Sequence, residues 1–154
     1  MEIYMDVSTL TDRLNDAVLS ERLGALYDLV QMERFGAFDA VEQHGDVNNH
    51  IHTWYSFSPY SPAKAIWMAH RAGLATAGIM DHDSISGAAE FHDAAKIAGM
   101  KATSGVELRV SFKDTPFSAV RINNPDQIGN AYIALHAVPE CKRGELKVFL
   151  GQIC

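Results

Sequence analysis

The chain has 154 residues, of which 47% are hydrophobic and 21% are charged, and its formal net charge is −6. This composition is typical of one globular domain with a sizeable core and excludes a disordered chain. No apolar run approaches the roughly 20 residues of a membrane span, and the acidic N-terminal stretch lacks the features of a secretory signal. We therefore expect a cytoplasmic protein with no membrane partner, and the acidic balance makes duplex nucleic acid a poor partner.

Residues 1–45 are predicted to form a helical N-terminal extension. Leu10 and Leu14 recur at helical spacing, and Ser8 or Thr11 can cap the first helix. No pattern here indicates chemistry, so we expect a hairpin of helices that packs on the main domain or on a second subunit.

Residues 46–154 are predicted to form an α/β domain. The predicted strands are 47–52, 74–80, 101–112 and 131–138, with 144–150 as a further candidate strand. Helices are predicted from Pro62 to residue 71 and, capped by Asp83 or Ser84, as far as residue 97 with Gly99 closing it. This β-α-β-α-β order predicts a parallel sheet, either open or closed into a barrel, while residues 113–130 are predicted to be a loop.

Histidines and carboxylates follow three of the predicted strands. His50 and His52 close the first strand, Asp81 and His82 follow the second, and Glu107 comes late in the third. In α/β folds, functional groups gather at the carboxyl ends of the strands. Two histidines that are two positions apart on a strand point to the same face, and ions such as zinc, manganese or iron accept imidazole together with carboxylate. The sequence therefore predicts a metal site with several ligands.

Each of these groups has an ordinary structural interpretation when taken alone. A lone H-x-H pair is weak evidence for a metal, and Asp81 can either ligate an ion or hold the free ring nitrogen of a histidine. His70 and His92 lie in predicted helices and are expected to be surface histidines or hydrogen-bonded core histidines. His44 could lie near the site, and the sequence leaves its role open.

The order of the motifs resembles a known family. Residues 48–56 read NNHIHTWYS, residues 73–90 read GLATAGIMDHDSISGAAE, and residues 104–107 read SGVE. These stretches are similar to the polymerase and histidinol phosphatase (PHP) superfamily, and most of all to its stand-alone metal-dependent phosphoesterases. The resemblance implies a distorted (β/α)7 barrel with two or three divalent metal ions, zinc, manganese or iron, at the carboxyl ends of the strands.

The resemblance also implies roles for individual residues. His50 and His52 match the first-motif ligands, His82 and Asp81 match the second-motif histidine and its adjacent acid, and Glu107 matches the bridging glutamate. The implied catalytic residues are Glu107, His82 and Asp81. The implied metal ligands are His50, His52, Asp81, His82, Glu107 and His136, the last as the nearest match to a histidine that follows the glutamate in relatives.

The sequence departs from the family pattern in three places. Phe57 and Ser58 stand where many relatives carry an aspartate ligand, and Tyr132 rather than a histidine opens the strand after the glutamate. No histidine follows His136, although relatives end with a late histidine and a late D-x-H. Because a closed α/β barrel takes about 250 residues, we expect a barrel that is incomplete at this length.

The function that this resemblance implies is hydrolysis of a phosphomonoester or small phosphodiester by metal-activated water. Arg109 or Lys101 would contact the phosphate, or each would be a solvated surface charge. The alternative is a catalytically incompetent metal-binding module with a structural or regulatory role, and a homodimer of two half-barrels would reconcile the two. Amidohydrolase chemistry is a third hypothesis, which the D-H-D turn followed by G-V-E disfavours.

Overall fold

The computed structural model describes residues 6–123 and 126–153, so the parts of the predictions that fall on residues 1–5 and 124–125 lie outside it. The helices are α1 (Val7–Arg13), α2 (Leu19–Arg34), α3 (Pro62–Arg71), α4 (Ala88–Ala98) and α5 (Glu140–Ile153). The strands are β1 (Val47–Ile51), β2 (Thr76–His82), β3 (Lys101–Ser111) and β4 (Asn130–Leu135). None of the helices within these described ranges is long and apolar enough to cross a membrane.

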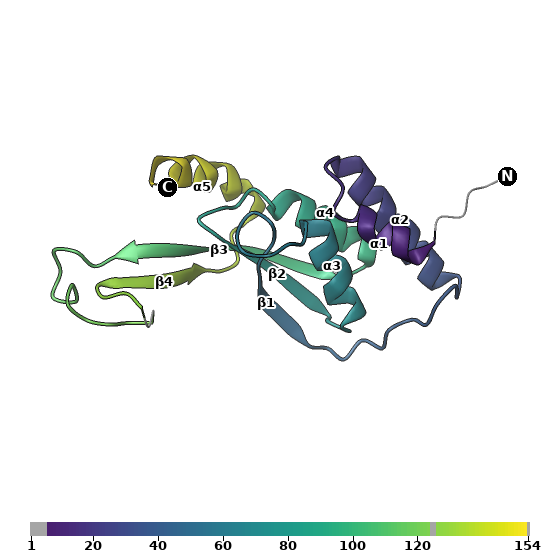
Figure 1. Ribbon diagram of the computed structural model, residues 1–154, viewed down its shortest axis with the longest axis horizontal. Coiled ribbons are helices and arrows are strands. Elements are labelled where there is room, and N and C mark those ends of the chain that lie inside the picture. The colour runs from purple at the N-terminus through teal and green to yellow at the C-terminus, as the bar shows by residue number, and fades with distance from the viewer. Residues whose placement is uncertain (1–5, 124–125, 154) are drawn as a thin grey trace.

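The four strands form one sheet in the order β1-β2-β3-β4 (Figure 1). β1, β2 and β3 are parallel, as the sequence predicts, because α3 and α4 supply the crossover connections that parallel strands need. β4 is antiparallel to β3, and the described residues of the connection between them (112–123 and 126–129) form no crossover helix. The α/β class is therefore confirmed, and a closed (β/α)7 barrel stays a prediction.

β3 belongs to two different pairings along its length. Its first part, from Lys101 to Glu107, pairs with β2, and its second part, from Val106 to Ser111, pairs with β4. The β3–β4 ribbon extends away from the helices that cover the rest of the sheet (Figure 1). Consequently the point at which β3 passes from one partner to the other is occupied by Glu107.

The N-terminal helices pack on the sheet domain, which is the first of the two arrangements expected for this hairpin. Leu10 in α1 and Leu26 in α2 are buried and share one hydrophobic core with residues of α3 and α4. The predicted caps are wrong, because α1 begins earlier: Asp6, two residues before Ser8, is the N-cap, and its carboxylate accepts from the backbone N–H of Thr9.

A buried ion pair fastens the same hairpin to the sheet domain. Arg22 of α2 donates from Nε and from one of its terminal nitrogens to the two carboxylate oxygens of Glu90 in α4, at 2.8 and 2.5 Å. The guanidinium also lies 4.8 Å from the ring centroid of Trp54, close after β1. The hairpin therefore contacts both a crossover helix and the loop that follows the first strand.

One predicted helix boundary near the carboxyl end of β2 is wrong. α4 begins at Ala88 with Gly87 as its N-cap, because the chain makes a further turn before the helix starts, so neither Asp83 nor Ser84 caps it. Gly99 closes α4 in the left-handed conformation as predicted, with φ 69°.

The candidate strand at residues 144–150 is also wrong, since these residues lie inside α5. Leu146 and Leu150 are four positions apart, which places them on one face of a helix, and both contact the hydrophobic core. The short apolar run fits either a strand or a helix by period alone, and packing on the core selects the helix.

Candidate metal centre

The pairing of β2 with β3 sets His82 beside Glu107. The two residues are partners in the parallel register, and Nε2 of His82 lies 3.4 Å from Oε2 of Glu107. The backbone N–H of Asp83 donates to the carbonyl of Glu107 at 2.9 Å, and Asp83 adopts a positive φ of 51° to do so. This turn therefore fixes the carboxyl end of β2 against β3 at Glu107.

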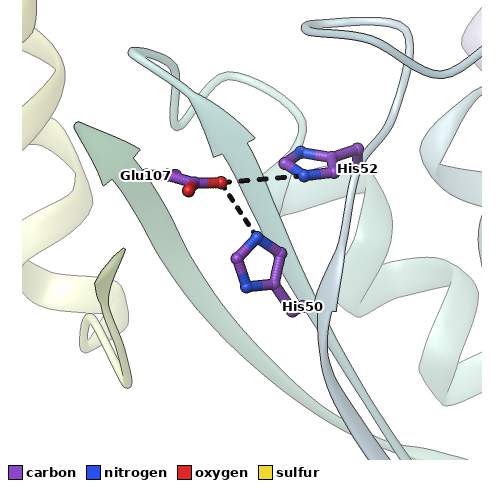
Figure 2. Close-up of side chains that lie close together, drawn as sticks. All are labelled: His50, His52 and Glu107. Carbon is purple, nitrogen blue, oxygen red and sulfur yellow. Dashed lines mark hydrogen bonds and ion pairs between the residues drawn. The ribbon is translucent and has the colours of Figure 1, made fainter. Parts of the chain in front are cut away.

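β1 brings two more imidazoles to the same carboxylate. Nε2 of His50 lies 2.9 Å from Oε2 of Glu107, and Nε2 of His52 lies 3.7 Å from the same oxygen (Figure 2). The register of β1 against β2 shifts by one residue between Asn48 and Ile51. Such a bulge changes where a side chain points, and here it includes His50.

The donor set fits a divalent cation. The ligating atoms of His50, His52 and Glu107 all lie within 4.8 Å of one another. A tetrahedral ion bound at about 2.0–2.2 Å holds its ligand atoms roughly 3.3–3.6 Å apart, so small movements of these side chains would accommodate one. The ring of His82 stacks on that of His52, with centroids 4.9 Å apart, so a third imidazole borders the group.

The protonation of His52 also suits a ligand. Burial lowers the pKa of His52, and the neighbouring His82 and His50 lower it further, while Glu107 and Asp81 act in the opposite direction. Since an imidazole binds a metal in its neutral form, a lowered pKa leaves more of His52 ready to bind at neutral pH.

Both carboxylate oxygens of Asp81 accept hydrogen bonds from residues close to the histidine pair. Oδ1 accepts from the backbone N–H of Thr53 at 2.6 Å and from the hydroxyl of Ser56 at 2.8 Å, and Oδ2 accepts from the Thr53 hydroxyl at 2.6 Å. The Ser56 hydroxyl also lies 3.3 Å from Nδ1 of His52. Of the two roles expected for Asp81, this geometry favours holding a histidine over ligating an ion.

The structure does not bring His136 into this group. His136 is exposed, follows the end of β4, and lines a groove of about 470 Å³ against α5. Among the described residues, the ligating atoms that meet within 4.8 Å belong to His50, His52 and Glu107. A ligand role for His136 therefore stays a prediction without support from the geometry.

The two candidate phosphate contacts differ in position. Arg109 is exposed near the site, and its guanidinium lies 3.6 Å from the carboxylate of Asp83. Lys101 begins β3 and pairs with Thr76 at the start of β2, whereas Glu107 pairs with His82 at its end. Six residues of strand span roughly 20 Å, so Lys101 lies at the opposite end of the sheet.

The remaining histidines behave as ordinary structural residues. Nε2 of His70 is hydrogen-bonded to Glu33, and Nε2 of His92 lies 3.2 Å from the hydroxyl of Ser104, as expected for hydrogen-bonded core histidines. His44 is exposed, and its backbone N–H donates to the carbonyl of Gly73.

Sequence reasoning assigned no role to four residues around the site. Thr53 and Ser56 bind Asp81, while the rings of Phe57 and Tyr132 lie edge-on to His82 with centroids 4.8 and 5.2 Å away. Thr53 and Ser56 stand inside the H-x-H-T…S motif, which could have drawn attention to them. Neither aromatic residue carries a motif signal other than standing where relatives have a ligand.

Comparisons with known proteins agree with the motifs. The model of the PHP domain family matches residues 48–149. A crystal structure of a Bifidobacterium adolescentis protein, itself proposed to be a metal-dependent phosphoesterase, is similar with 20% sequence identity and a TM-score of 0.43. The alignment covers 70% of this chain and 33% of that one, so this chain spans about a third of that protein's length. A search of curated proteins finds no match.

Proposed function

Because the chain belongs to the PHP domain family, we propose that it is a metal-dependent phosphoesterase that hydrolyses a phosphomonoester or a small phosphodiester. The observation that carries this proposal is the convergence of three imidazole nitrogens on one oxygen of Glu107. His50, His82 and His52 approach that oxygen to 2.9, 3.4 and 3.7 Å, and they come from two separate segments of chain, at the ends of β1 and β2.

The proposed chemistry divides between the ions and the protein. Bound divalent cations would supply positive charge for the phosphoryl oxygens and would make water a better nucleophile. His50, His52 and His82 would hold them through ring nitrogens, together with the carboxylate of Glu107. Asp81, through Ser56, would keep the ring of His52 in the orientation that binding requires.

Several finer features belong to the same proposal. Zinc, manganese or iron suits a mixed imidazole and carboxylate set, with two or three ions in a complete site. A (β/α)7-type barrel that is incomplete at this length, a division into residues 1–45 and 46–154, a cytoplasmic location and a homodimer are parts of this proposal, and each can be tested separately.

A second candidate is a metal-binding module without catalytic activity. It is favoured by the position of His136, which is exposed beyond the end of β4 and lines a different groove. If the ligands of the described site are His50, His52, His82 and Glu107 alone, fewer ions could be held than a complete site needs.

Elemental analysis of the purified protein, followed by phosphatase assays with added zinc, manganese or iron, tests both candidates. The proposed enzyme should hold at least one transition metal per chain and should hydrolyse simple phosphoesters. Glu107→Gln should abolish turnover and weaken metal binding, whereas Glu145→Gln, an exposed glutamate of α5 paired with Lys142, should do neither. Tight metal binding without turnover would favour the inactive module, and less than one metal per chain would contradict both.

A further inference from the structure

The ring of Phe57 stands exposed at the edge of the histidine cluster. Phe57 is 80% exposed, yet its ring lies edge-on to that of His82, with the centroids 4.8 Å apart and the planes at 70°. Burial of an apolar ring of this size is favourable, and Phe57 gains little of that free energy while it remains exposed. One face of Phe57 is therefore available beside the group that would bind a phosphoester.

The backbone around Phe57 is held firmly although the side chain is exposed. The N–H groups of Ser56 and Ser58, on either side of it, both donate to the carbonyl of Thr53, at 2.9 and 3.3 Å. The side chain of Ser56 is fixed in addition by the buried carboxylate of Asp81. Because the loop is already ordered in the folded protein, little conformational entropy of the loop would be lost when a ligand contacts Phe57.

A second aromatic ring borders His82. Tyr132 of β4 lies with its centroid 5.2 Å from His82 and its plane at 75°. The side chain of Asn123 fixes this residue, because it accepts from the Tyr132 backbone N–H at 2.9 Å and donates to the Tyr132 carbonyl at 2.7 Å. Two aromatic side chains, each carried by a hydrogen-bonded segment of backbone, thus border one histidine of the candidate centre.

We propose that Phe57, with Tyr132 beside it, selects phosphoesters whose leaving group carries a planar ring, which would pack on the exposed face of Phe57. This inference rests on the proposed function, since it concerns the substrate of that same site. Aromatic rings pack face-to-face with an offset or edge-to-face, and each such contact adds to the binding gained from apolar area alone. Phe57 and Tyr132 would therefore determine specificity and would take no part in the chemical step.

The test compares three substrates on the metal-loaded full chain: benzyl phosphate, cyclohexylmethyl phosphate and ethyl phosphate. Their leaving groups are all primary alcohols, so differences in turnover report on contacts of the ring. We expect kcat/KM for benzyl phosphate to exceed that for the other two by roughly three- to tenfold. Phe57→Ala should remove this preference through KM, and Phe57→Tyr should keep it.

A matched control is Phe35→Ala, since Phe35 is 85% exposed and follows α2. This variant should leave the preference for benzyl phosphate unchanged. If Phe57→Ala lowers turnover of all three substrates equally, or lowers the metal content, Phe57 only supports His82 and the inference is wrong. An equal loss for benzyl and cyclohexylmethyl phosphate would also contradict selection of a planar ring.

Binding of phosphonates separates this inference from the proposed function. Benzylphosphonate and ethylphosphonate have a P–C bond in place of the P–O ester bond and are not hydrolysed, so calorimetry measures recognition without turnover. Tighter binding of benzylphosphonate that is lost in Phe57→Ala would support the inference even if the protein hydrolyses nothing. Turnover of simple phosphoesters together with equal binding of the two phosphonates would overturn the inference and leave the proposed function standing.

Discussion

The hydroxyl of Ser56 donates a hydrogen bond of 2.8 Å to the carboxylate of Asp81, although the two residues are 25 positions apart. The same hydroxyl lies 3.3 Å from Nδ1 of His52, the nitrogen that does not face Glu107. The buried carboxylate and the serine therefore form a support for one imidazole of the candidate centre. Groups that hold the second nitrogen of a metal-binding histidine affect metal affinity without touching the ion.

Asp81→Asn should weaken metal binding and destabilise the fold. An amide presents an N–H group where the carboxylate accepts from Thr53 and Ser56, so one buried donor loses its partner, at a cost of about 1–3 kcal/mol. Loss of such a support lowers metal affinity by roughly 10–100-fold. Metal titration and denaturant unfolding of the metal-free protein measure the two effects.

The control for this variant is Asp93→Asn, which changes an exposed aspartate paired with Lys96 on α4. It should leave metal affinity unchanged, because Asp93 lies on the surface of a crossover helix. If Asp81→Asn weakened metal binding as much as Glu107→Gln does, Asp81 would be a direct ligand and the assignment from hydrogen bonds would be wrong.

Bound metal should stabilise the protein through His52. A matched variant at another histidine should keep this stabilisation. A ligand present at 100 times its dissociation constant adds about 2.7 kcal/mol to the free energy of unfolding. Addition of the bound metal should therefore raise the Tm of the wild type, and His52→Ala should lose most of that rise. His92→Ala removes a hydrogen bond to Ser104 and should keep the full metal response, whatever its own starting Tm. An unchanged response in His52→Ala would contradict a ligand role.

Much of the candidate site could be predicted from the sequence because strand period and strand order are local properties. The H-x-H spacing places His50 and His52 together, and the β-α-β-α-β order brings His82 next to Glu107. The bulge in β1 could not be predicted, because it depends on how β1 and β2 fit against each other.

The role of Asp81 shows a different limit. In the sequence, a carboxylate before a histidine is equally consistent with a metal ligand and with a residue that supports a histidine. The positions of Thr53 and Ser56 in the fold distinguish these two roles for Asp81. The local sequence pattern likewise could not predict the direction of β4 or the helical state of α5. Both depend on which surface the segment packs against, as the burial of Leu150 illustrates.

Glu90→Gln should strongly destabilise the protein, because it leaves the buried guanidinium of Arg22 without its counter-charge. Breaking a buried ion pair by changing one partner costs roughly 3–5 kcal/mol. Glu145→Gln breaks an exposed pair with Lys142 and should cost less than about 1 kcal/mol. Unfolding in denaturant measures both, and equal effects in the two variants would contradict the role assigned to the Arg22–Glu90 pair.

Stability should fall in acid partly through Glu33. Burial opposes ionisation of this carboxyl, but hydrogen bonds and charges from His70 and Arg71 outweigh burial and lower the pKa of Glu33 below its ordinary value of 4.5. A group whose pKa is lowered in the folded state contributes stability above its unfolded pKa and loses it as the pH falls through the folded value.

We therefore expect Glu33→Gln to be less stable than the wild type at pH 7, with the difference shrinking as the pH falls from about 5 to 3. The measurement is denaturant unfolding in the presence of a chelator, so that metal binding does not add its own pH dependence. A difference that stays constant from pH 7 to pH 3 would show that the charge of Glu33 contributes nothing.

Two glycine substitutions should have opposite effects, because one position is crowded and the other is open. A Cβ at Gly105 would lie 2.5 Å from the carbonyl oxygen of Leu135 and 2.6 Å from Cε of Met80, whereas a Cβ at Gly144 meets nothing within 4 Å. Gly105→Ala should push β4 away from β3, two positions before Glu107, and destabilise the protein by about 1–3 kcal/mol. Gly144→Ala, inside α5, should stabilise it by roughly 0.5–1 kcal/mol, since alanine favours a helix. Thermal unfolding measures both, and a loss of stability in Gly144→Ala would contradict the helical state of α5.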